Sequence, residues 1–224
     1  MYKAKVNDVG ALYCETKEGA KSSGNYVYSE FFKVTDVICG ILNIQVPDIA
    51  IYPGLIPKRN PETGERSLDS GETFHMDEHP EIKNSIMMIA LEEEYDPAYL
   101  TSVIAHELRH IHQRKYLPEL GINGHAKGGK DTLYHPEEID ADGFAIAYLV
   151  SCGYSFESAG AITCPLEKGN YPRAYKLRME KAHEIYEETF EKKKADSSVS
   201  HTEESAEKEG AKKESFFKKI KHLF

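Results

Sequence analysis

Two histidines lie four residues apart in the segment His-Glu-Leu-Arg-His at 106–110, with Glu107 beside the first of them. On an α-helix, positions i and i+4 lie on one face, so the two imidazoles can hold one metal ion together. Glu107 then lies next to that ion, where its carboxylate can take a proton from a metal-activated water. These residue types at this spacing indicate a metal site suited to hydrolysis.

A catalytic zinc site uses three protein ligands and leaves a fourth position for water, so a third ligand must come from elsewhere in the chain. The segment Glu-Ile-Asp-Ala-Asp at 138–142 supplies Glu138, and Asp142, one turn later, can orient a ligating imidazole. Glu137, Asp140 and Asp142 are near enough to compete, and we prefer Glu138 because an aspartate follows it at i+4. A different site could recruit three further imidazoles, at His112, His125 and His135.

Both segments lie in patterns typical of helices. Asp96 can cap a helix over 97–117, and Pro118 follows its end. Pro136 opens a second helix over 136–152, with acidic residues in its first turn. Apolar residues at helical spacing in the first helix form one stripe: Leu100, Val103, Ile104, Leu108 and Ile111.

With this pair of segments, HExxH followed by ExxAD, residues 85–152 resemble the gluzincin class of zinc metallopeptidases, particularly its small single-domain members. The resemblance implies that Zn²⁺ binds His106, His110 and Glu138. It also implies that Glu107 is the general base for hydrolysis of a peptide bond, and that Asp142 supports the imidazole of His106. We accordingly expect an α+β, zincin-like fold, with a small, mostly antiparallel sheet packed on three or four helices.

Gluzincins usually add a side-chain donor that stabilises the oxyanion formed during attack on the carbonyl. The candidates come from a helix that Pro172 opens and that runs to about Lys194. We expect Tyr175 or Arg178 to have this role. Other polar side chains of the same region are Tyr171, Arg173 and His183.

The rest of the chain predicts further elements around these helices. A helix is expected over 29–43, a short strand over 49–52 and a long surface excursion over 57–80. A strand over 85–91 directly precedes the motif helix, and we expect it to be a sheet edge along which a peptide substrate lies. The alternative is a fully paired core strand, because its apolar run lacks clean alternation.

Composition divides the chain into four parts. We expect a weakly ordered segment or hairpin over 1–27, a metallopeptidase domain over 28–190, a disordered linker over 191–214 and a basic amphipathic segment over 215–224. The last segment combines Phe and Leu with Lys at helical spacing, as in a peptide that docks in a protein groove or on a membrane surface.

Charge and cysteine usage limit the other function classes. A net charge of −9 argues against a nucleic-acid partner, and the four cysteines show no CxxC spacing, as in a reduced cytoplasmic protein. We recognise no signal peptide and no apolar stretch long enough to span a bilayer. The prediction is a cytoplasmic zinc metallopeptidase acting on proteins or peptides. The alternatives are a non-catalytic zinc-bearing binding module and a zinc hydrolase of a non-peptide bond.

Overall fold

A computed structural model of the chain describes residues 5–6, 12–14, 26–53, 55–59, 64, 66–75, 84–91, 96–120 and 132–191. Its strands are β1 (Lys5–Val6), β2 (Leu12–Cys14), β3 (Asp48–Pro53), β4 (Ile56–Arg59), β5 (Arg66–Asp69), β6 (Gly71–Phe74) and β7 (Ile86–Leu91). Its helices are α2 (Tyr26–Leu42), α3 (Pro97–Tyr116), α4 (Pro136–Ser151), α5 (Phe156–Thr163), α6 (Pro165–Asn170) and α7 (Pro172–Tyr186). Short 3₁₀ turns (Pro118–Leu120 and Thr132–Tyr134) and a π-helical turn (Glu187–Glu191) complete these elements.

The main sheet is small and mixed, in the order β1-β2-β3-β7-β6. Strands β3 and β7 pair in parallel, and each of the other neighbouring pairs is antiparallel. The long excursion between β3 and β7 carries the β4–β5 hairpin and β6, and this connection is long enough to return the chain in the parallel direction. The expectation of an α+β fold is confirmed. Among the described strands the sheet is mixed: three of its four pairings are antiparallel, in line with the expected mostly antiparallel sheet, and the pairing of β3 with β7 is the parallel exception.

Strand β7 is not at the edge of the sheet, where we had expected the strand over 85–91 to lie. It pairs with β3 on one side and with β6 on the other, so the fully paired alternative for residues 85–91 is right. The reason is burial on both faces: Met87 and Ile89 are 0% exposed on one face, and Met88 is only 7% exposed on the other. A strand covered on both faces has a continuous apolar run. In the part of the chain that the structure describes, β6 ends the sheet on this side.

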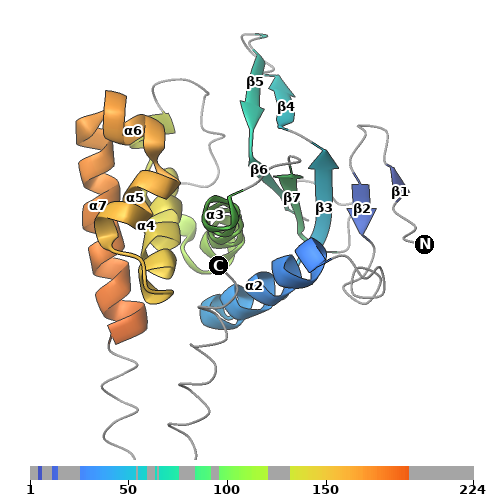
Figure 1. Ribbon diagram of the computed structural model, residues 1–224, viewed down its shortest axis with the longest axis horizontal. Coiled ribbons are helices and arrows are strands. Elements are labelled where there is room, and N and C mark those ends of the chain that lie inside the picture. Colours follow the sequence, from blue (N-terminus) through green and yellow to red (C-terminus); the bar gives the residue numbers. More distant parts are fainter. Residues whose placement is uncertain are drawn as a thin grey trace, which may run out of the picture.

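Helix α3 lies at the centre of the molecule. It contacts β6 and β7 on one side and α4 on the other, while α2 packs along it and α7 packs on the far side of α4 (Figure 1). One apolar core joins the sheet to these helices through residues such as Ile38, Met87, Leu108 and Phe144. A second core, which includes the fully buried Ile146, joins α4 to α5 and α7. Helix α4 is therefore buried from two sides.

Local signals set where the central helices begin. The Asp96 carboxylate accepts a hydrogen bond of 2.8 Å from the backbone N–H of Ala98, and Pro97 occupies the first turn of α3. Pro136 and Pro172 open α4 and α7 in the same way, as expected. Helix α2 begins at Tyr26, three residues before the start expected at residue 29.

The ends of the chain are only partly described. Strands β1 and β2 pair antiparallel within residues 1–27, which agrees with the hairpin alternative. The expected linker beyond Glu191 and the segment 215–224 lie outside the described residues. Among the helices that the structure describes, none is both long and apolar enough to cross a membrane.

Candidate metal centre

Three side chains from two helices converge between α3 and α4. Ligand atoms of His106, His110 and Glu138 all lie within 4.8 Å of one another, so this group could hold a metal ion. The Nε2 atoms of His106 and His110 are 2.9 Å apart, and they lie 3.4 Å and 3.8 Å from the two oxygens of Glu138. Ligands about 2.0–2.2 Å from a tetrahedral ion are roughly 3.3–3.6 Å from one another, so small side-chain shifts suffice to admit one.

Helix geometry explains the convergence. His106 and His110 are one turn apart on α3, with ring centroids separated by 4.6 Å and planes at 83°. Glu138 is in the first turn of α4, which begins at Pro136. Because α3 and α4 pack side by side, this first turn lies opposite the two imidazoles. Two other carboxylates that the sequence left open as the third ligand have different partners. Oε1 of Glu137 lies 3.3 Å from Nδ1 of His135, and Asp140 forms an ion pair with Arg109.

Electrostatics keep the carboxylate of Glu138 ionised. Burial by itself raises the pKa of Glu138, but its hydrogen bond to His106 and the nearby imidazole of His110 outweigh burial, and the pKa falls to about 2. Burial likewise works to lower the pKa of His106, whereas Asp142 and Glu138 together raise it well above its ordinary value. Without metal the site thus holds a carboxylate beside a proton-binding imidazole, and a cation entering it would displace that proton.

Asp142 supports His106, as expected. Its Oδ1 accepts a hydrogen bond of 2.8 Å from Nδ1 of His106, which leaves Nε2 directed at Glu138 and His110. The other oxygen, Oδ2, accepts a bond of 2.6 Å from Nε of Arg178. Arg178 is 3% exposed, and its Nη1 also donates to the carbonyls of Leu133 and Ala174. Arg178 on α7 therefore positions Asp142, and Asp142 in turn positions the imidazole of His106.

His110 has a different support. Its Nδ1 lies 2.9 Å from Oε1 of Gln113, a side chain that is 0% exposed. The amide nitrogen of Gln113 donates to the carbonyl of Glu137 and to Oδ2 of Asp140, each at 2.8 Å. Asp140 in turn accepts two hydrogen bonds from Arg109, of 2.7 Å and 3.1 Å.

Glu107 points toward the end strand of the sheet. It is 6% exposed, and its Oε2 accepts a hydrogen bond of 2.7 Å from the hydroxyl of Thr73 on β6. A Cβ atom built on Gly71 of the same strand would lie 2.5 Å from Oε1 of Glu107. Glycine is therefore the residue that allows this carboxylate to lie against β6.

The two side chains expected to stabilise an oxyanion make other contacts. The guanidinium of Arg178 is engaged with Asp142 and two carbonyls, which makes Arg178 a positioning residue. The ring of Tyr175 packs in the second core, with its hydroxyl against Gly160 of α5. The sequence placed both residues on the helix that Pro172 opens, but it carried no information about which neighbour each one meets. These contacts give no support to the oxyanion role that we expected for them.

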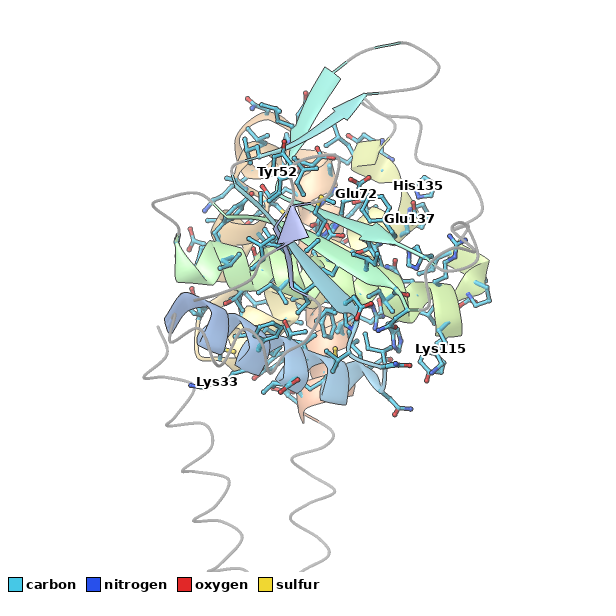
Figure 2. All side chains as sticks on the ribbon, turned by 90° about the vertical axis from the view of Figure 1, so that its right-hand side faces the viewer. Lys33, Tyr52, Glu72, Lys115, His135 and Glu137 are labelled. Carbon is cyan, nitrogen blue, oxygen red and sulfur yellow. The ribbon has the colours of Figure 1, made fainter. Side chains whose placement is uncertain are left out.

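The remaining candidates lie around the centre. Nδ1 of His112 is 2.9 Å from the carbonyl of Leu42, so this imidazole ties α3 to α2. His135 lies beside Glu137 at the start of α4, both labelled in Figure 2. Arg173 lies over the ring of Tyr134, and His183 stacks on Phe156. His125 is outside the described residues.

Sequence reasoning missed Thr73, Gln113 and Arg109. Of these, only Gln113 left a usable signal, because it follows His110 at i+3 on the same helix.

Comparison of the chain with protein-family models, with curated proteins and with solved structures gave no match. The fold and the site alone define the class of this protein: it is an α+β protein in which two histidines and a glutamate could hold a metal ion.

Proposed function

We propose that this protein is a zinc-dependent metallopeptidase with a zincin-like arrangement. The observation that carries the proposal is the convergence of His106, His110 and Glu138, with the carboxylate of Glu107 buried one residue away from the first ligand. Two imidazoles and one carboxylate are a ligand set typical of catalytic zinc, which retains a position for water. The group fits zinc better than Mg²⁺ or Ca²⁺, because those ions prefer oxygen ligands throughout.

The residues divide the chemistry among them. A zinc ion held by His106, His110 and Glu138 would supply Lewis acidity for activating water and polarising the scissile carbonyl. Glu107 accepts the proton of the attacking water on its carboxylate and then delivers it to the leaving amine. Thr73 keeps Oε2 of that carboxylate in place by donating a hydrogen bond of 2.7 Å. Asp142 and Gln113 hold the two imidazoles.

Strand β6 is a suitable surface for an extended peptide. It ends the sheet in the described part of the chain, and Gly71 and Thr73 lie directly against Glu107. A sheet edge offers backbone N–H and C=O groups that can pair with a peptide main chain. A peptide paired along β6 would run next to the carboxylate that moves the proton, so we place the substrate here and not along β7.

The test combines metal content with turnover. Purified protein should contain about one zinc ion per chain and cleave denatured proteins or peptides, with activity lost on chelation and restored by zinc. Glu107→Gln should retain zinc and lower kcat by roughly 10²–10⁴-fold, because it removes the proton acceptor without removing a ligand. Full activity in that variant would refute the mechanism.

A zinc-loaded protein that cleaves esters or other small substrates, but no peptide among a broad panel, would overturn the choice of substrate. Zinc bound with no turnover of any substrate class would indicate a non-catalytic role.

A further inference from the structure

We propose that Gln113 is the positioning residue that directs Nε2 of His110 toward the metal. The inference rests on the proposed metal site and concerns how that site is assembled. Gln113 is 0% exposed and does not itself belong to the group of ligands. A buried primary amide must satisfy both its donor and its acceptor ends, so its partners report its orientation.

The neighbours of Gln113 fix which way its amide points. On one side lie the carbonyl oxygen of Glu137 and Oδ2 of Asp140, both 2.8 Å away, and neither of these atoms can donate a hydrogen. The NH₂ group of Gln113 must therefore face them. Its Oε1 consequently faces Nδ1 of His110, 2.9 Å away.

This orientation determines the tautomer of His110. An amide oxygen can only accept, so Nδ1 of the imidazole carries the hydrogen. The lone pair is then on Nε2, which is the atom that lies near His106 and Glu138. Gln113 thus selects the one neutral form of His110 that can coordinate a metal from this position.

The amide cannot rotate away, because its anchor is itself held. Arg109 donates hydrogen bonds of 2.7 Å and 3.1 Å to the two oxygens of Asp140, so this carboxylate is held in place. Arg109 and Gln113 belong to α3, whereas Asp140 and the carbonyl of Glu137 belong to α4. The same network therefore joins the two helices that carry the ligands.

The two imidazoles are supported by groups of different charge. His106 contacts a carboxylate directly, whereas His110 contacts a neutral amide that separates it from Asp140. A carboxylate raises the basicity of the imidazole that it accepts from, and an amide oxygen does so much less. Gln113 thereby orients its ligand without bringing another negative charge into contact with the site.

The test compares zinc affinity and the tautomer of His110 in the full chain. Gln113→Met preserves side-chain length and removes both polar ends. We expect the zinc dissociation constant, measured by competition with a chelator, to rise by about 10–100-fold. In the metal-free protein, imidazole ¹⁵N shifts should show the hydrogen of His110 on Nδ1 in the parent chain, and a mixture of forms in Gln113→Met.

Two controls separate orientation from stability. Ile146→Ala empties a site in the second core, away from the ligands, and should lower stability while leaving the zinc dissociation constant within about twofold. The second control is the metal-free parent chain, in which the ¹⁵N shifts of His110 decide the orientation even if Gln113→Met folds poorly.

Wild-type zinc affinity in folded Gln113→Met would overturn the proposal, and so would a hydrogen on Nε2 of His110 in the metal-free parent chain. Failure of the parent chain to bind zinc would instead refute the proposed function, while the tautomer of His110 would still decide the role of Gln113.

Discussion

Replacing Arg178 by methionine tests whether α7 contributes to the metal centre through an ion pair. Arg178 is 3% exposed and its partner Asp142 is 14% exposed, with Nε and Oδ2 separated by 2.6 Å. Burial works to lower the pKa of Arg178, but Asp142 raises it above its ordinary value, so the guanidinium is charged at all accessible pH. Removing Arg178 leaves the Asp142 carboxylate with His106 as its remaining partner. Loss of one member of a buried pair costs about 3–5 kcal/mol, and the contact with His106 puts this loss at the lower end of that range.

For a domain of this size, that loss corresponds to a decrease in Tm of roughly 6–20 °C. The assay is thermal and urea denaturation of the metal-free protein, so that zinc binding does not contribute to the measured stability. Arg173→Met is the matched control, because Arg173 is on the same helix and contacts the face of Tyr134 at 5.8 Å. We expect the control to lower Tm by only a few degrees. Equal losses in the two variants would show that the pair with Asp142 adds nothing measurable, and would refute the reasoning.

Three further predictions concern individual side chains. Thr73→Val removes the hydroxyl that holds Glu107, so kcat should fall by up to about 100-fold with zinc content unchanged, and a loss of zinc would contradict this. Glu138→Gln should release zinc in dialysis, whereas Glu137→Gln should retain it, because only Glu138 belongs to the ligand group; equal retention would exclude Glu138 as a ligand. Burial raises the pKa of Cys152 to about 11, so its thiol stays protonated at pH 8. Alkylation by iodoacetamide, followed by mass spectrometry of the native protein, should accelerate only as the pH approaches 11. Rapid labelling at pH 8 would contradict the burial of this thiol.

The local part of the site could be predicted from the sequence. The spacing of His106 and His110 fixes their relative position as soon as the segment is helical, and the signals at Asp96 and Pro136 set where both helices begin. Glu138 was preferred because Asp142 follows it at i+4, and the structure places its carboxylate near both imidazoles.

The contacts between distant segments could not be predicted in the same way. The apolar run at β7 is compatible with an edge or a central strand, and only pairing with both β3 and β6 decides between them. Thr73 reaches Glu107 from 34 residues away in the chain, and no spacing rule connects these two positions. The contacts of Arg178 and Tyr175 could not be predicted for a related reason: helical spacing locates both residues on α7 but does not reveal the atoms opposite each of them.

Helix α4 contributes Glu138, Asp140 and Asp142 within little more than one turn, and each of them contacts a residue of α3. Binding of a metal ion by this group would therefore be thermodynamically linked to the packing of α4 on α3, because the ion would add attraction between the same two helices. Free zinc at 100 times its dissociation constant would add about 2.7 kcal/mol to the folding free energy. Scarcity of zinc would then weaken the packing of α4 on α3 and increase the fraction of unfolded chains that proteases can degrade. The supply of zinc would in that case affect the lifetime of the protein as well as its metal content.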